Sequence, residues 1–389
     1  MKNEVFWKNP GYKVRKSLKK DIECDYLIVG GGVLGVSLAY FLEKEKAGKI
    51  VLIEKNTIAS GATGKAAGSI VIRGELDLRE IIQHHGKNRG LVFWRASHEG
   101  LHLMKEIVKK EKIKCDFEAQ DTLYGALYGE RHKFLLEEYA YEKEIEKTPE
   151  LLSELISDKK MDRHIKTNLF QYAILSKGHG ISVNPLAYTQ NLSKVLGKDV
   201  SVYENTRLEK INKNIALTKN GKIRFKQAIV AIDADLRNNK VKNRETTIAV
   251  TKKLTEKQLS DIGLKEKKIV WTTKDKYEYF KVTKDDRLLV GFGDVTVGKS
   301  HKKINANKIH LKRIMAFLKE MFPQLNVKWE CTWSGTYGVT KNYIPVIDIK
   351  NDVIYVGGAS SQLVCTITAR YLANKLIGKS SALDKFFWV

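Results

Sequence analysis

Cysteine is scarce in this chain, with four residues among 389. They are Cys24, Cys115, Cys331 and Cys365, which lie far apart and form no Cys-x-x-Cys pair. Neither a disulfide framework nor a metal site is therefore expected, and a reducing, cytoplasmic compartment fits this usage. Long apolar runs are absent too. No stretch approaches the ~20 residues of a membrane-spanning helix, and the first residues are basic without the apolar core of a secretory signal.

Proline is also rare, with five residues, and no low-complexity linker or internal repeat divides the chain. The length and the 43% hydrophobic content indicate one large domain or two intertwined ones. Acidic residues are too few to balance the basic ones, 45 against 69, which gives a net charge of +24. This excess indicates either a polyanionic partner or a generally lysine-rich chain. Because lysine outnumbers arginine and is interleaved with acids, the second interpretation is favoured.

One motif lies near the N-terminus. Residues 26–29 form a short apolar run typical of a buried parallel strand. They lead into Gly30-Gly31-Gly32-Val33-Leu34-Gly35, which fits GxGxxG. An apolar helix pattern follows, and then a second strand, residues 50–53, which ends at Glu54. Strand, glycine turn, helix, strand and acid stand in the order of a dinucleotide-binding βαβ unit.

Each part of this unit has a physical role. Gly30 permits the tight turn, Gly32 lets the backbone approach a pyrophosphate, and Gly35 allows close helix–strand packing. The helix N-terminus at Val33-Leu34 presents N–H groups to the phosphates. Glu54 is placed to accept hydrogen bonds from a ribose.

A loop of small residues, 58–70, comes directly after this acid and reads IASGATGKAAGSI. Small side chains let backbone amides lie close to a bulky flat cofactor, which favours a flavin over a nicotinamide. The expected contacts are Lys55, Ser60, Gly61, Ala62, Thr63, Gly64, Ala67 and Gly68.

The loop is a near match to SGASGRNAG, which follows the ribose-binding acid in the D-amino-acid oxidase-like (DAO) superfamily of FAD-dependent oxidoreductases. The chain resembles this family. Its segment 9–22 is similar to the γ-glutamylputrescine oxidoreductase and glycine–sarcosine oxidase branch. Further similar segments cover most of the chain: residues 181–186, 200–211 with Glu204 and Thr206, 279–282, 286–291, 333–340, 344–347 and 353–358.

The resemblance implies an α/β fold (α+β overall). A Rossmann-like FAD-binding domain would be interleaved with a substrate domain built on a mixed or antiparallel sheet with helices. The expected FAD-binding ranges are residues 20–80, 165–240 and 336–389, the substrate-binding ranges are 81–164 and 241–335, and residues 1–19 are a basic extension. The first insertion is expected to be helical. The second is expected to begin with a strand over 246–250 and to end with a helix over 304–321.

In this family the flavin carries the chemistry: an amine loses a hydride and becomes an imine, which water hydrolyses. The resemblance implies an oxidoreductase that acts on a C–N bond of an amine or amino-acid derivative, with oxygen, a quinone or another carrier as acceptor. It places four side chains at the reacting centre: Tyr279, Lys281, Trp333 and Tyr337. It implies further cofactor contacts from Arg207, Ala231, Gly335, Gly358, Ala359, Ser360, Ser361 and Gln362.

Two departures concern the substrate and the acceptor. Amino-acid oxidases of the family hold the substrate carboxylate with an arginine where this chain has Tyr337, which favours an amine or derivatised amine over a free α-amino acid. Lys281 or Lys341 would be another source of positive charge. Sarcosine oxidase-like members place a lysine over the flavin where this chain has Leu289, so oxidase and dehydrogenase both stay open. Aromatic residues are expected to line the site: Tyr277, Tyr279, Trp333, Tyr337 and Tyr343.

Three departures concern the cofactor. Lys65 occupies the place of a histidine that links flavin covalently in some relatives, so FAD is expected to be non-covalent. Cys331 is the alternative covalent link. The glycine-rich turn before the last helix reads Gly358-Ala359-Ser360-Ser361-Gln362, and an Ala-Thr-Gly turn reads Ala231-Ile232-Asp233. The histidines at 84, 85, 179 and 301 lack metal-binding spacing and are interpreted as surface or loop residues.

Two alternatives come from the charge and the C-terminus. The net charge of +24 motivates an RNA-associated flavoprotein, which modifies or binds tRNA. The same charge and the tail Phe386-Phe387-Trp388-Val389 motivate a membrane-surface dehydrogenase that passes electrons to quinone. The other interpretation of the tail is that it docks on the protein's own surface or on a second subunit.

Overall fold

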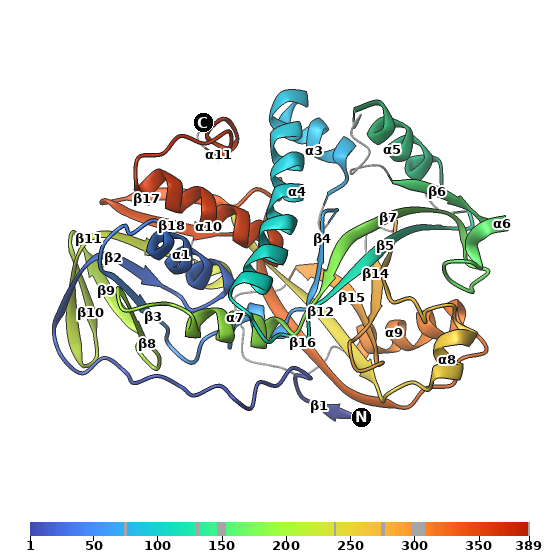
Figure 1. Cartoon of the computed structure of the whole chain (residues 1–389), viewed down its shortest axis with the longest axis horizontal. Helices are drawn as coiled ribbons and strands as arrows, with labels where there is room; N and C mark the ends of the chain where they lie inside the picture. Colours follow the sequence, from blue (N-terminus) through green and yellow to red (C-terminus); the bar gives the residue numbers. More distant parts are fainter. Residues whose placement is uncertain are drawn as a thin grey trace.

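The protein is seen here as a computed structural model that describes residues 1–73, 76–129, 132–145, 153–236, 239–273, 277–296 and 308–387. Two sheets lie beside each other, and the long helix α4 (Lys87–Lys110) runs between them (Figure 1). We call them the parallel sheet and the mixed sheet. The α/β class with a dinucleotide-type sheet and a second, mixed sheet is confirmed.

The parallel sheet carries the glycine motif. The C-terminal ends of its central strands are apolar because both faces are covered there. Helices α1, α7 and α10 cover one face, and the N-terminal segment with the β9–β10 hairpin covers the other. From edge to edge its strands are β17 (Val346–Lys350), β18 (Val353–Gly357), β11 (Gly221–Val230), β2 (Ile22–Val29), β3 (Ile50–Ile53) and β8 (Val200–Tyr203), and β10 (Ile215–Thr218) joins β11 to β9 (Leu208–Asn212).

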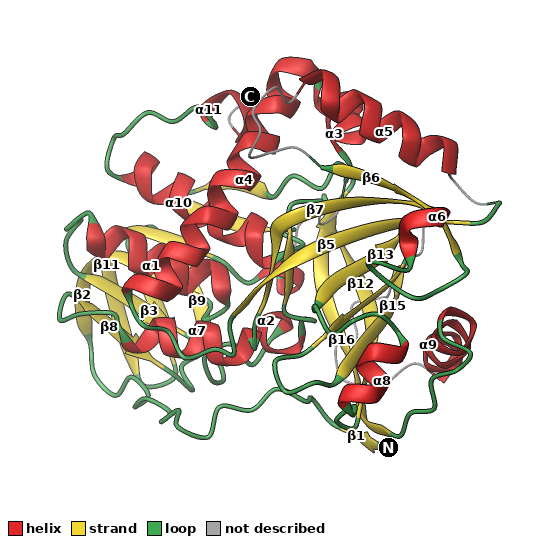
Figure 2. Ribbon diagram, turned by 45° about the vertical axis from the view of Figure 1, so that its right-hand side comes forward, coloured by secondary structure: helices red, strands yellow, loops and turns green. Residues whose placement is uncertain are grey.

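The mixed sheet curves around the right-hand half of the molecule (Figure 2). Phe280 and Val282 of β14 pack with α8 and α9 on one face, whereas Tyr279 and Lys281 lie on the other, toward the parallel sheet. In order its strands are β1 (Lys2–Asn3), β16 (Trp329–Thr340), β12 (Val241–Thr251), β15 (Leu288–Thr296), β14 (Glu278–Val282), β13 (Lys268–Thr272), β5 (Glu118–Leu127), β7 (Phe170–Ser182) and β4 (Ser69–Val71), and β6 (Glu154–Ser157) pairs with β7.

Helices fill the space around both sheets. Besides α4 they are α1 (Val33–Lys44), α2 (Ala62–Lys65), α3 (Leu78–His85), α5 (His132–Ile145), α6 (Asp158–Met161), α7 (Pro185–Lys194), α8 (Glu256–Asp261), α9 (Lys308–Met321), α10 (Gln362–Leu376) and α11 (Asp384–Phe387), with a 3-10 turn η2 (Asp233–Asp235).

Several elements differ from the expected ranges. Strand β7 lies within the range 165–240 but hydrogen-bonds in the mixed sheet. The first insertion is not wholly helical, because it contains β5 and β6. Strand β12 begins at Val241, five residues before the expected start at Thr246. Residues 301–307, where the last helix of the substrate range was expected to begin, lie outside the described residues, as does His301.

The N-terminal segment is packed along both sheets. Lys2 and Asn3 pair in parallel with β16, and Leu18 is 1% exposed. The buried Glu204 carboxylate accepts hydrogen bonds from the backbone N–H groups of Arg15 (2.5 Å) and Ile58 (2.6 Å). Glu204 therefore joins the N-terminal segment, the end of β8 and the small-residue loop.

The C-terminal tail docks on α4. Phe386 is 2% exposed, and its ring stacks on Phe93 with 4.6 Å between centroids. Arg89 Nη2 donates to the carbonyl of Phe386 (2.9 Å). For Phe386 and Phe387 these contacts agree with the interpretation that the tail docks on the protein's own surface. Trp388 and Val389 lie outside the described residues.

Across the described ranges, no helix combines the length and apolar character that crossing a bilayer requires. The same ranges hold no group of three His, Cys, Asp or Glu side chains arranged to bind a metal ion.

Glu204→Gln is expected to lower the free energy of unfolding by about 2–3 kcal/mol. The amide keeps one acceptor, but its NH2 group then faces the second buried N–H, which is left unsatisfied. Urea unfolding measures the effect, with the exposed Glu209→Gln as the control. Equal stability of the two variants would contradict the bridging role of Glu204.

Candidate active site

The glycine motif forms the turn between β2 and α1. Gly30 has φ +116°, and a Cβ there would lie 2.2 Å from the carbonyl oxygen of Ala231. A Cβ at Gly35 would lie 2.0 Å from the carbonyl oxygen of Gly30, so the fold itself requires both glycines. A Cβ at Gly32, the N-cap of α1, would meet only Thr63 Oγ1, at 3.3 Å, among the described residues. The space at the helix N-terminus is therefore open, as a pyrophosphate requires.

Glu54 lies beside this opening at the end of β3. Its carboxylate accepts hydrogen bonds from the backbone N–H groups of Gly31 (2.7 Å) and Asn56 (2.8 Å). The N–H of Val33, the first residue of α1, donates to Thr63 Oγ1 (3.1 Å). The acid and the threonine thus frame the helix N-terminus from two loops.

Two expected cofactor residues lie at the rim of this region. Lys55 forms an ion pair with Asp235. Arg207 is exposed, next to Thr206, whose N–H donates to the carbonyl of Glu54 (2.8 Å). Both residues follow strands of the parallel sheet, and both are exposed.

The small-residue loop is held in place by hydrogen bonds to its backbone carbonyl groups. Three buried side chains donate to them: Trp333 Nε1 to Lys65 (2.8 Å), Trp7 Nε1 to Ala66 (2.8 Å) and Lys281 Nζ to Gly68 (2.7 Å). Burial lowers the pKa of Lys281 to about 7. Lys281 and Trp333 therefore contact the loop, and Trp7, which sequence analysis missed, completes the set.

The residues expected at the reacting centre share one face of the mixed sheet. Tyr279, Gly291, Ile248 and Trp333 form one row across neighbouring strands, and Trp271 of β13 extends it. The ring of Tyr279 covers Gly291, where a Cβ would lie 2.0 Å from the ring. The period-two spacing of strand residues is what brings these side chains together.

Tyr337 lies on the same face of β16, four residues after Trp333. Its cross-strand partner is Arg244 of β12. The Arg244 guanidinium donates to the hydroxyl of Tyr343 (3.4 Å) and lies 5.7 Å from the centre of that ring. Sequence analysis missed Arg244 because the expected strand began two residues later, at Thr246. A longer period-two strand would have placed Arg244 beside Tyr337.

The turn before α10 carries buried polar atoms. Ser360 Oγ and both polar atoms of the Gln362 side chain have no hydrogen-bond partner among the described residues. Ser361 is the N-cap of α10, and its hydroxyl accepts from the N–H of Val364 (3.2 Å). Ser361 therefore caps the helix, while Ser360 and Gln362 keep unused polar groups that fit the polar edge of a flavin.

Asp233 joins this turn to β16. It has φ +45°, a left-handed conformation that suits the glycine of the related Ala-Thr-Gly turn and that aspartate tolerates. Its carboxylate accepts from the N–H groups of Gly338 (2.9 Å) and Gly358 (3.1 Å). Burial raises the pKa of Asp233 to about 6, although these two N–H groups oppose the rise.

Cys331 lies on β16, two residues before Trp333, and is 2% exposed. Burial raises the pKa of its thiol to about 11, which disfavours the thiolate that a covalent link would need. FAD bound without a covalent link fits this environment.

His179 is not a surface loop residue as expected. It lies in β7, half-buried, and its ring is 5.2 Å from that of His98 on α4. No periodic pattern in the sequence links these two histidines, which are 81 positions apart.

The stability difference between the wild type and Asp233→Asn is expected to depend on pH. A folded-state pKa of about 6 lies above the ordinary value of ~3.9. Its favourable contribution is therefore present below about pH 4 and is lost as the pH rises through 6. The wild type should lose about 2–3 kcal/mol relative to the variant between pH 4 and 7.5. Urea unfolding at both pH values measures this, with the exposed Asp199→Asn as control; a constant difference would contradict it.

The family described as FAD dependent oxidoreductase (DAO) matches residues 25–375. The chain is 25% identical over 386 residues to γ-glutamylputrescine oxidoreductase of Escherichia coli, which covers 95% of this chain and 87% of that protein. It is 25% identical over 388 residues to a protein of Haemophilus influenzae named probable oxidoreductase OrdL, covering 93% and 85%.

Two solved structures share the fold. Glycine oxidase from Geobacillus kaustophilus has a TM-score of 0.78 at 16% identity, covering 94% of this chain and 98% of that chain. L-proline dehydrogenase from P. horikoshii has a TM-score of 0.76 at 16% identity, covering 93% and 95%. Because the family match spans most of the sequence and the motif geometry agrees with it, this chain belongs to the DAO family of FAD-dependent oxidoreductases.

Proposed function

We propose that this enzyme oxidises a C–N bond of an amine or amino-acid derivative, and that water hydrolyses the resulting imine. The observation that carries the proposal is the arrangement around β16. Gly335 lies against Lys65 of the small-residue loop, Gly338 is tied through Asp233 to the turn before α10, and Tyr337 stands between them. A flavin held by the loop and the turn would therefore face this part of the mixed sheet.

FAD, when bound, supplies the hydride acceptor. Within this chain the open N-terminus of α1 would hold the pyrophosphate, Glu54 the ribose, and Ser360 with Gln362 the polar edge of the ring. Lys281 would act as a positioning residue, because its ammonium group donates a hydrogen bond to the carbonyl of Gly68. Near pH 7 about half of the protein molecules would carry Lys281 in its neutral form, which limits the buried charge.

The substrate would meet an aromatic surface. Tyr279 and Tyr337 are half-buried on the face toward the loop, and the hydroxyl of Tyr279 lies 3.4 Å from Thr246 Oγ1. Tyr337 offers no bidentate carboxylate contact. Curated and structural relatives named for γ-glutamylputrescine, glycine and L-proline support a substrate that carries an amine.

Purified protein is expected to show flavin absorbance bands that remain in the supernatant after acid precipitation, because the link is non-covalent. Anaerobic addition of an amine panel should bleach these bands for at least one member. Flavin in the acid pellet would promote Cys331 to a covalent ligand. Protein that stays colourless after reconstitution with FAD would overturn the proposal.

Gly32→Ala and Gly35→Ala are expected to fail in different ways. The new methyl at position 32 has room in the fold but intrudes on the pyrophosphate, so FAD affinity should fall at least tenfold while the free energy of unfolding without FAD changes by less than about 1 kcal/mol. At position 35 the methyl meets the carbonyl of Gly30, so the fold itself should be destabilised. FAD titration and urea unfolding of apoprotein separate the two effects. Unchanged FAD affinity in Gly32→Ala would contradict the assigned site.

A further inference from the structure

The small-residue loop, residues 58–70, is held near its end by the N-terminal segment, residues 2–18. Trp7 of this segment is 5% exposed, and its Nε1 donates to the carbonyl of Ala66 (2.8 Å). The Lys281 Nζ atom lies 5.4 Å from the centre of the Trp7 ring. The indole is therefore enclosed between the loop and the mixed sheet, and it supplies one of the three side-chain donors that hold the loop.

The same segment is joined to the start of the loop at Ile58. The Glu204 carboxylate accepts hydrogen bonds from the N–H groups of Arg15 (2.5 Å) and Ile58 (2.6 Å). Gln190 of α7 donates from Nε2 to the carbonyl of Ile58 (3.1 Å), and its Oε1 accepts from Asn9 Nδ2 (3.0 Å). Each backbone polar group of Ile58 is thus linked to the N-terminal segment through one intervening side chain.

The N-terminal segment has little regular structure of its own. Lys2–Asn3 form β1, whereas residues 4–18, all of which the structure describes, contain no helix or strand. The segment is held at separate points, among them the side chains of Trp7, Asn9 and Leu18. Because few backbone hydrogen bonds hold it, such a segment can detach while both sheets stay folded.

Both sides of the loop are used at once. Its small residues would bring backbone amides to the cofactor, while its carbonyl groups accept hydrogen bonds from the N-terminal segment and the mixed sheet. Ordering the loop costs conformational entropy. A partner that meets an already ordered loop does not bear this cost again, so it binds more tightly.

We propose that docking of the N-terminal segment and binding of FAD favour each other, with Trp7 and Asn9 as the positioning residues that connect them. Such coupling is reciprocal: the factor by which the docked segment tightens FAD binding equals the factor by which FAD holds the segment in place. The inference rests on the proposed position of FAD against the loop. It does not depend on the substrate or on the electron acceptor.

Hydrogen–deuterium exchange of the wild type, as the holoenzyme and after removal of FAD, tests the coupling without a variant. FAD should slow exchange about tenfold in peptides from residues 58–70 and in peptides that contain the N–H groups of Arg15 and Leu18, which are bonded to Glu204 and Thr206. Helix α8, on the far face of the mixed sheet, is the control and should exchange equally in both forms.

Two other outcomes separate the inference from the proposed position of the cofactor. Slower exchange in the loop with no change in the N-terminal segment would overturn the coupling and leave the cofactor position intact. Exchange that FAD changes in neither segment would overturn the cofactor position, and the coupling with it.

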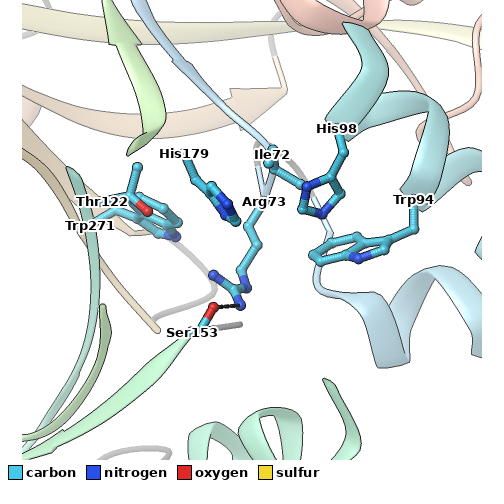
Figure 3. Close-up of a pocket in the computed structure, with 8 residues that line it drawn as sticks. All are labelled: Ile72, Arg73, Trp94, His98, Thr122, Ser153, His179 and Trp271. Carbon is cyan, nitrogen blue, oxygen red and sulfur yellow. Dashed lines mark hydrogen bonds between the residues drawn. The ribbon is translucent and has the colours of Figure 1, made fainter. Parts of the chain in front are cut away.

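Trp7→Phe keeps an aromatic ring and removes the N–H donor to Ala66. It should speed release of FAD from the holoenzyme about tenfold and should speed exchange in the N-terminal segment as well. Trp94→Phe is the matched control. Trp94 is 2% exposed, and in Figure 3 it lies beside Arg73 and His98. Its variant should release FAD within about twofold of the wild-type rate, and equal acceleration in both variants would contradict the role of Trp7.

Asn9→Ala acts at the other end of the loop. It should speed FAD release in the same direction but less than Trp7→Phe does, because Gln190 keeps its own bond to Ile58. Across the wild type, the two single variants and Trp7→Phe/Asn9→Ala, the rate of FAD release and the rate of exchange in the N-terminal segment should rise together. Faster release with unchanged exchange in the segment would show that the two are not linked and would overturn the inference.

Discussion

The rest of the site depends on the small-residue loop between β3 and β4. Its backbone must lie close to the cofactor on one side, and its carbonyl groups need hydrogen-bond donors on the other. A buried carbonyl without a donor costs free energy comparable to a lost hydrogen bond. The carbonyls of Lys65, Ala66 and Gly68 each receive a side-chain donor from outside the parallel sheet, and the carbonyl of Gly68 also accepts from the N–H of Val183 (2.9 Å). Two of the donors are indoles, which bury a large apolar surface and offer a single N–H.

This requirement couples the two sheets. Trp333 and Lys281 belong to the mixed sheet and Trp7 to the N-terminal segment, and all three donate to one loop that begins at the edge of the parallel sheet. The loop thus ties the mixed sheet to the glycine motif by hydrogen bonds, in addition to the apolar cluster that the two sheets share. A lysine in this place is costly, since burial lowers its pKa to about 7. Its Nζ donates to the carbonyls of Gly68 (2.7 Å) and Val183 (3.5 Å), which offsets part of this cost.

Local patterns were sufficient for part of this site. The roles of Gly30 and Gly35 follow from spacing alone, and the shared face of Tyr279 and Lys281 follows from strand periodicity, whereas Trp333 was grouped with them only through the family resemblance. Register between distant strands was not predictable. Arg244 was missed because nothing in the sequence marks where β12 begins.

The burial and the pairing of charged side chains could not be predicted from local sequence either. Arg73 has no local feature that separates it from an exposed arginine, and only the return of α5 brings Glu142 to it, 69 positions later. Asp233 has a similar origin: its two N–H donors come from β16 and from the turn before α10. The glycine that relatives have in that turn would supply the conformation but neither hydrogen bond.

The overall charge of the chain and the charge of its site are therefore separate quantities. Many lysines are exposed, and exposed ion pairs such as Lys177–Glu154 and Lys265–Glu256 contribute little to stability. Charges at the centre are few, buried and individually compensated: Arg73 by Glu142, Asp233 by backbone N–H groups, and Lys281 by a carbonyl and partial neutrality. A long-range field from exposed lysines is screened within ~10 Å in ordinary salt. Selection among substrates must then come from the buried groups, and +24 says little about which molecule enters.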